Sequence, residues 1–105
     1  RRLVVEVKSV TLVDDGVALF PDAVTARGAR HVDELAALAA RPGWEAAVLF
    51  VLQREGAREI RAAAELDPRF AERLDAARRA GVRVLGRRCR VSETAVTLGD
   101  PVPVG

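Results

Sequence analysis

A run of seven consecutive apolar residues at positions 46–52, AAVLFVL, constrains the fold of this chain more than any other feature. Its length is that of a β-strand, and a strand without a polar face is stable only where both of its faces are covered. We therefore expect residues 46–52 to form a central strand of a parallel or mixed sheet. The 105 residues, 50% of them apolar, suffice for one such domain and not for two.

Helices and further strands alternate around this run. Residues 3–13 are dense in β-branched side chains and predict a strand that ends at an Asp-Asp-Gly turn. Apolar residues at helical spacing predict one helix over 25–40 and a second, opened by an Asp-Pro cap, over 67–81. A strand with a bulge at its glycine follows over 82–91, whereas the polar stretch 53–65 predicts a loop with a short strand or a helical turn. This order predicts an α/β fold with a mixed central sheet flanked by helices.

The chain has one cysteine, no methionine and no apolar stretch long enough to span a bilayer. One cysteine excludes an intrachain disulfide and every multi-cysteine metal site, so Cys89 is expected to be a small strand residue. The lack of a membrane span and of a signal peptide predicts a soluble, cytoplasmic protein without a membrane partner. Because the sequence opens inside a predicted strand and contains no methionine, we expect it to be a fragment of a longer protein.

Basic residues are concentrated in segment 78–91, which holds six arginines and no acid. Such a block can contact nucleic-acid phosphates, although a solvated basic face gives the same pattern. Arg87 and Arg88 are the residues that we assign to DNA contact. The whole chain has 16 arginines and a single lysine, Lys8. Its retention is either chance or the mark of a place where arginine cannot replace a compact ammonium.

Glu6 and Lys8 lie on one face of the first predicted strand, because side chains alternate along a strand. Two interpretations fit this pair on a mostly apolar face: an ion pair near a sheet edge, or a pair that acts on a ligand. In the second interpretation Glu6 binds Mg²⁺ or Mn²⁺, while Lys8 orients a water molecule and offsets the charge of a phosphorane. One carboxylate makes a poor magnesium site, so this chemistry requires a second acid from a neighbouring strand or turn.

Four further residues are candidates for ligand contact. His31 adjoins the apolar stripe of its predicted helix and is a structural histidine, a phosphate contact or a proton-transfer group. Arg27, near the N-terminus of the same helix, is either an anion contact or a solvated side chain. Gln53 follows the buried strand, where α/β folds place ligand-contacting groups, and is either such a group or an ordinary polar residue at a strand end. Asp22, which comes after a proline, is either an auxiliary metal ligand or a turn or capping residue.

Two sequence blocks occur together in this chain, EVKSVTL at residues 6–12 and FPDAVTARGARH at residues 20–31. Shorter matching pairs follow at Glu34-Leu35, Gln53-Arg54, Asp67-Pro68 and Gly81-Val82. With these segments the chain resembles the C-terminal domain of the sugar fermentation stimulation protein family. The resemblance runs from the first strand to near the end of the chain.

The resemblance implies a restriction-endonuclease-like fold. The family pairs an OB-like N-terminal domain with a C-terminal domain similar to PD-(D/E)XK nucleases, and it is described as DNA-binding and linked to regulation of sugar utilisation. Glu6 and Lys8 match the E-x-K half of the nuclease motif, whose first acid lies upstream of that strand. Residues 1–105 are therefore expected to be a partial, N-terminally truncated nuclease-like domain that lacks the OB-like domain. Asp22 follows the E-x-K strand and does not match the motif aspartate.

On these grounds we expect a DNA-binding domain that resembles Mg²⁺- or Mn²⁺-dependent phosphodiesterases and contacts DNA without sequence specificity. The 105 residues alone are expected to be inactive as a nuclease, because they lack the upstream acid, and to self-associate through an unpaired strand edge. Two alternatives stand beside this function. One is a non-catalytic DNA-binding or regulatory module, and the other is a structural interaction domain whose arginines bind an acidic protein.

Overall fold

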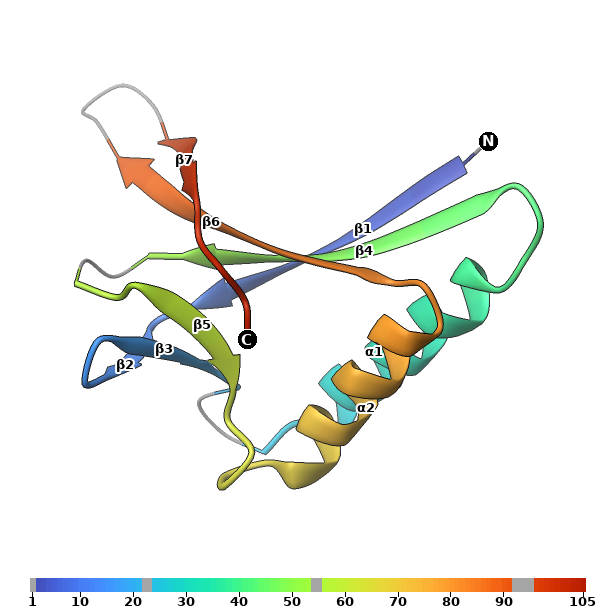
Figure 1. Ribbon diagram of the computed structural model, residues 1–105, viewed down its shortest axis with the longest axis horizontal. Helices are drawn as coiled ribbons and strands as arrows, with labels where there is room; N and C mark the ends of the chain where they lie inside the picture. Colours follow the sequence, from blue (N-terminus) through green and yellow to red (C-terminus); the bar gives the residue numbers. More distant parts are fainter. Residues whose placement is uncertain (1, 22–23, 54–55, 92–95) are drawn as a thin grey trace.

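The computed structural model describes residues 2–21, 24–53, 56–91 and 96–105, which form two β-sheets and two helices around one core (Figure 1). The large sheet has the strand order β1-β4-β6-β7, and the small sheet has the order β2-β3-β5. The elements follow one another along the chain as β1 (Arg2–Val10), β2 (Leu12–Asp14), β3 (Val17–Phe20), α1 (Ala26–Ala39), β4 (Trp44–Leu52), β5 (Glu59–Ala62), α2 (Pro68–Arg79), β6 (Arg83–Val91) and β7 (Val96–Pro101).

The large sheet is mixed, with β1, β4 and β6 parallel and β7 antiparallel to β6. β4 lies between β1 and β6, which confirms the central position predicted for residues 46–52. The chain passes through α1 before β4 and through α2 before β6, stepping in one direction across the sheet. Right-handed crossovers taken in one direction place both helices on the same face, as Figure 1 shows. The predicted α/β class is confirmed, and the described helices flank one face of the sheet.

The strand expected over residues 3–13 is in fact two strands that belong to different sheets. β1 ends at Val10, whose carbonyl oxygen accepts a hydrogen bond from the Gln53 amide at 3.0 Å. β2 then pairs with β3 in a hairpin whose turn residues Asp15 and Gly16 have φ angles of 49° and 76°. β-branched side chains favour extended backbone over the whole stretch, so they do not mark the point at which the pairing partner changes.

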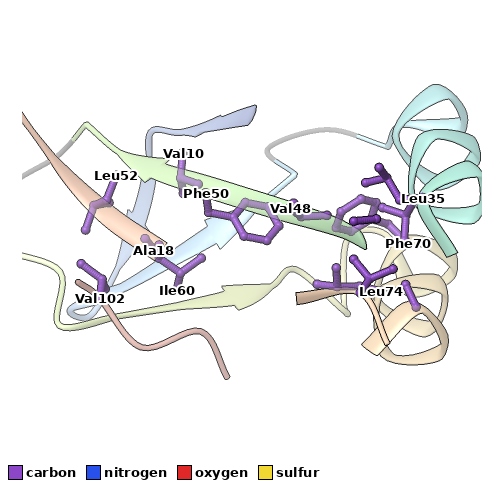
Figure 2. Packing of buried hydrophobic residues seen from close by; sticks show 14 of the residues in the cluster. Val10, Ala18, Leu35, Val48, Phe50, Leu52, Ile60, Phe70, Leu74 and Val102 are labelled. Atoms are coloured by element: carbon purple, nitrogen blue, oxygen red, sulfur yellow. The ribbon is translucent and has the colours of Figure 1, made fainter. Parts of the chain in front are cut away.

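The core lies between the inner face of the large sheet, the two helices and the small sheet (Figure 2). Phe50 of β4 and Phe70 of α2 are its largest fully buried side chains. The ring of Phe20 on β3 contacts both, with centroid distances of 5.4 Å to Phe50 and 5.3 Å to Phe70. The surrounding buried side chains come from all layers and include Val10, Ala18, Leu35, Val48, Leu52, Ile60, Leu74 and Val102.

Gly86 lies on the inner face of β6, where the C-terminal segment crosses the strand. A Cβ atom at this position would lie 2.6 Å from the carbonyl oxygen of Val102 and 2.9 Å from Cδ1 of Ile60. The Val102 amide donates to the Gly86 carbonyl oxygen at 2.8 Å, so the two backbones are held in contact. The bulge expected at Gly86 is not found there, because β6 pairs with β4 in regular register through Gly86; the register shift lies between Arg87 and Cys89, where β7 has the extra residue.

Asp67 joins the starts of the two helices. It is the N-cap of α2, as predicted, and its Oδ1 accepts a hydrogen bond from the Phe70 amide at 3.0 Å. Its Oδ2 accepts from the Thr25 amide at 2.9 Å, and the Thr25 hydroxyl caps α1 by accepting from the Gly28 amide at 2.9 Å. The Asp67 residue is 4% exposed. One buried carboxylate therefore links the start of α1 to the start of α2.

Replacing Asp67 by alanine is expected to lower the free energy of unfolding by about 2–3 kcal/mol, because it removes a helix cap and leaves the Thr25 amide without its acceptor. Asp67→Asn should cost about half as much, since the side-chain amide keeps one acceptor oxygen. Urea denaturation followed by circular dichroism measures both changes, with Asp75→Ala at an exposed site of α2 as the control. A loss below about 0.5 kcal/mol for Asp67→Ala would contradict this role.

Candidate functional site

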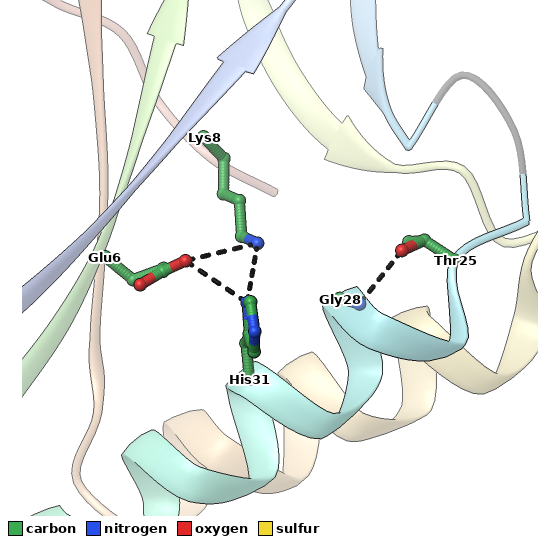
Figure 3. A network of polar contacts seen from close by, with 5 residues as sticks. All are labelled: Glu6, Lys8, Thr25, Gly28 and His31. Carbon is green, nitrogen blue, oxygen red and sulfur yellow. Dashed lines mark hydrogen bonds and ion pairs between the residues drawn. The ribbon is translucent and has the colours of Figure 1, made fainter.

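Glu6, Lys8 and His31 converge where β1 passes α1 (Figure 3). Glu6 Oε1 lies 3.4 Å from Lys8 Nζ and 3.3 Å from His31 Nδ1. Lys8 Nζ lies 3.5 Å from His31 Nδ1, which closes a triangle of polar atoms. Glu6 and Lys8 come from one face of β1, as strand alternation predicts, and His31 comes from the second turn of α1. We call these three residues the polar cluster.

The three side chains of the polar cluster differ in exposure. Those of Glu6 and His31 are 36% and 30% exposed, whereas that of Lys8 is 14% exposed. His31 Nδ1 can donate a hydrogen bond to Glu6 or accept one from Lys8, and the tautomer and charge of the ring decide which. The cluster therefore has an outer side, formed by a carboxylate and an imidazole, and an inner side formed by an ammonium.

The contact between Glu6 and Lys8 is the ion pair that one interpretation of the sequence predicts, and β1 is the edge strand among the described strands of the large sheet. The functional interpretation requires groups that a ligand can reach, and the partly exposed Glu6 carboxylate and His31 ring meet that requirement. The sequence predicts His31 as a structural residue, a phosphate contact or a proton-transfer group. The structure adds that its ring lies directly beside the Glu6 carboxylate.

Arg27 is exposed on the first turn of α1, four residues before His31. Residues at this spacing lie on the same side of a helix. Arg27 is therefore on the side of α1 that bears the polar cluster, close to the helix N-terminus, where backbone N–H groups favour anions. Its predicted contact with a phosphate is compatible with this position and stays a prediction.

Gln53 lies at the end of β4 but does not join the polar cluster. Its Nε2 donates a hydrogen bond to Ser9 Oγ at 3.1 Å. Ser9 belongs to the face of β1 opposite to Glu6 and Lys8, because side chains alternate along the strand. The Gln53 backbone amide donates to the Val10 carbonyl oxygen and extends the pairing of β1 with β4. A ligand contact by Gln53 would therefore be separate from the cluster, and it stays a prediction.

Arg87 and Arg88 are half-buried on β6 and donate hydrogen bonds to backbone carbonyl oxygens. Arg87 Nε donates to Gly99 O at 2.8 Å, and Arg88 Nη2 donates to Ala57 O at 2.7 Å. As neighbours on a strand, the two arginines point to opposite faces of the sheet, so they do not form one continuous basic surface. Each guanidinium keeps further N–H donors. Contact of Arg87 and Arg88 with DNA stays a prediction.

Glu6 and His31 are the residues of the polar cluster that can hold a divalent cation. A carboxylate oxygen suits Mg²⁺, Mn²⁺ and Ca²⁺, and an imidazole nitrogen is a softer additional ligand. Among the described residues, no three His, Cys, Asp or Glu side chains group together in a way that could hold a metal ion. Asp22, the predicted auxiliary ligand, lies outside the described residues. The cluster thus fits part of a cation site, to be completed by water, a phosphate oxygen or another carboxylate.

Two further expectations from the sequence concern Cys89 and the helices. Cys89 is a free, half-buried residue of β6, as expected for a small strand residue. In the part of the chain that the structure describes, no helix is long and apolar enough to cross a bilayer.

Parallel strands joined by helical crossovers, with a Glu-x-Lys pair on the inner face of the edge strand, define an α/β domain of the restriction-endonuclease-like type. The family model described as the sugar fermentation stimulation protein RE domain, SfsA, matches residues 1–95. The chain belongs to this family.

The relatives are sugar fermentation stimulation protein homologues. The homologue of Moorella thermoacetica is 49% identical over 100 residues, which are 95% of this chain and 43% of the relative. The homologue of Nitrosococcus oceani is 44% identical over 101 residues, again 95% of this chain and 43% of the relative. A solved structure, SfsA of Pyrococcus furiosus in complex with Ca²⁺, matches with a TM-score of 0.85 and 28% identity over 96% of this chain and 44% of that one. The chain therefore spans about 43% of the length of these homologues.

Proposed function

We propose that this domain binds a divalent cation and the phosphodiester backbone of DNA, and that it forms part of a metal-dependent phosphodiesterase in a family-length protein. The observation that supports the proposal is the polar cluster, in which Glu6, Lys8 and His31 meet within 3.5 Å of one another on the inner face of β1. The solved relative from Pyrococcus furiosus is described as a complex with Ca²⁺, which supports binding of a divalent cation in this family.

Each residue of the cluster has a distinct role in this proposal. Glu6 and the ring of His31 would hold the cation. When bound, the cation would polarise the phosphodiester and lower the pKa of a water molecule bound to it. With Glu6 and the unprotonated nitrogen of His31 engaged by the cation, the N–H donors of Lys8 Nζ would turn to a phosphate oxygen. The low exposure of Lys8 holds the ammonium in one place, so its charge is available where negative charge develops.

A second candidate is a DNA-binding module that needs a cation and does not cleave. It is favoured by the small number of cation ligands, because Glu6 and His31 are the two that meet among the described residues. Both candidates contact phosphates rather than base edges, so both predict DNA binding without sequence specificity. We propose the cytoplasm as the location for either function, because a bacterial DNA-binding protein meets DNA there and the homologues are bacterial. Cleavage of DNA by a family-length protein distinguishes the two.

Replacing Glu6 by glutamine in a family-length protein is expected to weaken binding of Ca²⁺ and Mn²⁺ by at least about tenfold, because a neutral amide replaces the one carboxylate of the cluster. Isothermal titration calorimetry measures the affinity for each cation. Glu34→Gln, at an exposed glutamate on the same helix as His31, is the matched control and should leave the affinity unchanged. Equal affinities of the Glu6→Gln variant and the wild type would show that Glu6 holds no cation.

A further inference from the structure

Trp44, the single tryptophan of the chain, contacts two arginines at the start of β4. The guanidinium carbon of Arg2 lies 5.2 Å from the centroid of the indole ring, and that of Arg41 lies 5.3 Å from it. Both distances are within the range of a cation–π contact. Arg2 and Arg41 are exposed, whereas Trp44 is half-buried. We call these three residues the Trp44 cluster.

The backbone brings the three residues of the Trp44 cluster together. Residues 41–44, Arg-Pro-Gly-Trp, form the turn from α1 to β4, in which the Trp44 amide donates to the Arg41 carbonyl oxygen at 3.1 Å. Proline at the second place and glycine at the third, with a φ of 79° for Gly43, are typical of a type II turn. Arg2 is the register partner of Trp44, and its amide donates to the Gly43 carbonyl oxygen at 2.8 Å. The turn and the sheet register therefore place two arginines at one aromatic ring.

The Trp44 cluster and the polar cluster lie along the same junction of β1 with α1. Arg2 and Glu6 are four residues apart on the strand, so their side chains share the inner face of β1 at a separation of about 13 Å. Arg41 follows His31 by ten residues, which corresponds to about 15 Å along a helix. Arg27 lies on the other side of His31, about one helical turn away. Arginines therefore stand on both sides of the polar cluster.

The guanidinium groups of Arg2 and Arg41 keep their N–H donors available. A cation–π contact uses the face of the guanidinium and leaves its five N–H donors unused. Within the described ranges, no ion pair or side-chain hydrogen bond joins either group to another residue, whereas Arg61, Arg73 and Arg88 are engaged in this way. Two positive charges at one ring repel each other, and a bound anion would remove that repulsion. A phosphate group suits this place, because arginine binds phosphate oxygens through two parallel N–H donors.

We infer that Arg2 and Arg41, held at Trp44, bind backbone phosphate of the DNA strand whose phosphodiester reaches the polar cluster. This inference rests on the proposed function and adds a second contact point to it. A separation of about 13 Å is that of about four nucleotides along a duplex, since the axial rise is about 3.4 Å. Trp44 is a positioning residue, because its ring restricts two long side chains that would otherwise be mobile. The contact is with the backbone and carries no sequence preference.

The test measures binding of a short labelled duplex to a family-length protein by fluorescence anisotropy, in Ca²⁺ and over a series of salt concentrations. The double variant Arg2→Gln with Arg41→Gln is expected to bind at least about tenfold more weakly and to flatten the salt slope by about one unit. Arg69→Gln, at an exposed arginine of α2, is the control and should change the affinity by less than about twofold. Trp44→Leu keeps both charges, so it should weaken binding about threefold with the salt slope unchanged. Trp44→Phe, which retains a ring, should restore the affinity.

Titration calorimetry with Ca²⁺ separates this inference from the proposed function. The double arginine variant should bind Ca²⁺ as the wild type does, because neither arginine contacts Glu6 or His31. Weaker duplex binding with unchanged Ca²⁺ affinity supports the inference. A wild type that binds the duplex, with a double variant no weaker than Arg69→Gln, would overturn the inference and leave the proposed function. A wild type that binds no duplex would overturn both, and a double variant that also loses Ca²⁺ affinity would show that these arginines act through the polar cluster and would overturn the phosphate contact.

Discussion

A family-length protein in which Lys8 is replaced by methionine is expected to cleave DNA about 10²–10³-fold more slowly than the wild type in Mg²⁺ or Mn²⁺. Methionine keeps an apolar stem in the niche where the lysine side chain is 14% exposed, and it removes the ammonium that faces Glu6 and His31. An interaction that is stronger in the transition state than in the bound substrate changes the rate and not the affinity. DNA affinity should therefore change by less than about threefold.

Single-turnover cleavage and fluorescence anisotropy measure the two quantities separately. Arg30→Met, at an exposed arginine of α1, is the control for loss of a positive charge and should leave the cleavage rate unchanged. Lys8→Arg should also be slow, because a flat guanidinium does not fit where a compact ammonium is enclosed. A wild type that binds DNA in the presence of a cation and does not cleave it would exclude the catalytic role of Lys8 and leave the binding module.

Local signals in the sequence predict the large sheet and the helices well. The run 46–52 is apolar on both faces, so neither face is stable in contact with water, and the run forms the interior strand β4. The first helix is marked by apolar residues at helical spacing, and the second by its cap, Asp67. These features are predictable because each depends on neighbouring residues in the chain.

The small sheet is harder to predict, because its strands depend on distant partners. β5 has Ile60 as its one buried large apolar residue, and it is held by pairing with β3 and by a bridge from Ile60 to Val104. The polar stretch 53–65 therefore gives only a weak signal for a strand. The boundary between β1 and β2 cannot be predicted from local sequence either. Both segments are rich in β-branched residues, and they differ only in the strand with which each pairs.

Local spacing in the sequence predicts part of the polar cluster, and the rest depends on contacts between distant parts of the chain. Strand alternation is enough to place Glu6 and Lys8 on one face of β1. The approach of His31 to Glu6 depends on how the crossover helix lies on the sheet, which no local spacing reveals. Gln53 is at a strand end, as predicted, but its contact with Ser9 on the other face follows from the register of β1 with β4.

The coverage of β1 is the one part of the predicted packing that this domain does not provide. A strand with two apolar faces predicts cover on both sides, yet Leu3, Val5 and Val7 are exposed. The prediction that both faces of β1 are covered follows from the free energy of burying apolar side chains, whatever the length of the chain.

Replacing Phe70 by alanine is expected to lower the free energy of unfolding by about 3–5 kcal/mol. Phe70 is fully buried on α2, and its ring packs edge-on against Phe20 at 5.3 Å. The loss combines the transfer free energy of the ring, a cavity between the helices and the sheet, and the aromatic contact. Domains of this size have total stabilities of about 5–15 kcal/mol, so the change removes a large share of the total.

Chemical denaturation followed by tryptophan fluorescence measures this change, because the single tryptophan, Trp44, lies at the start of β4. Leu66→Ala removes an apolar side chain from an exposed position and should cost less than about 1 kcal/mol. A loss below about 1.5 kcal/mol for Phe70→Ala would mean that the helices do not depend on this ring. In that case the position of His31 over β1 would be held by the other contacts of α1, which are its buried residues Val32 and Leu35 and the hydrogen bond of the Thr25 amide to Asp67.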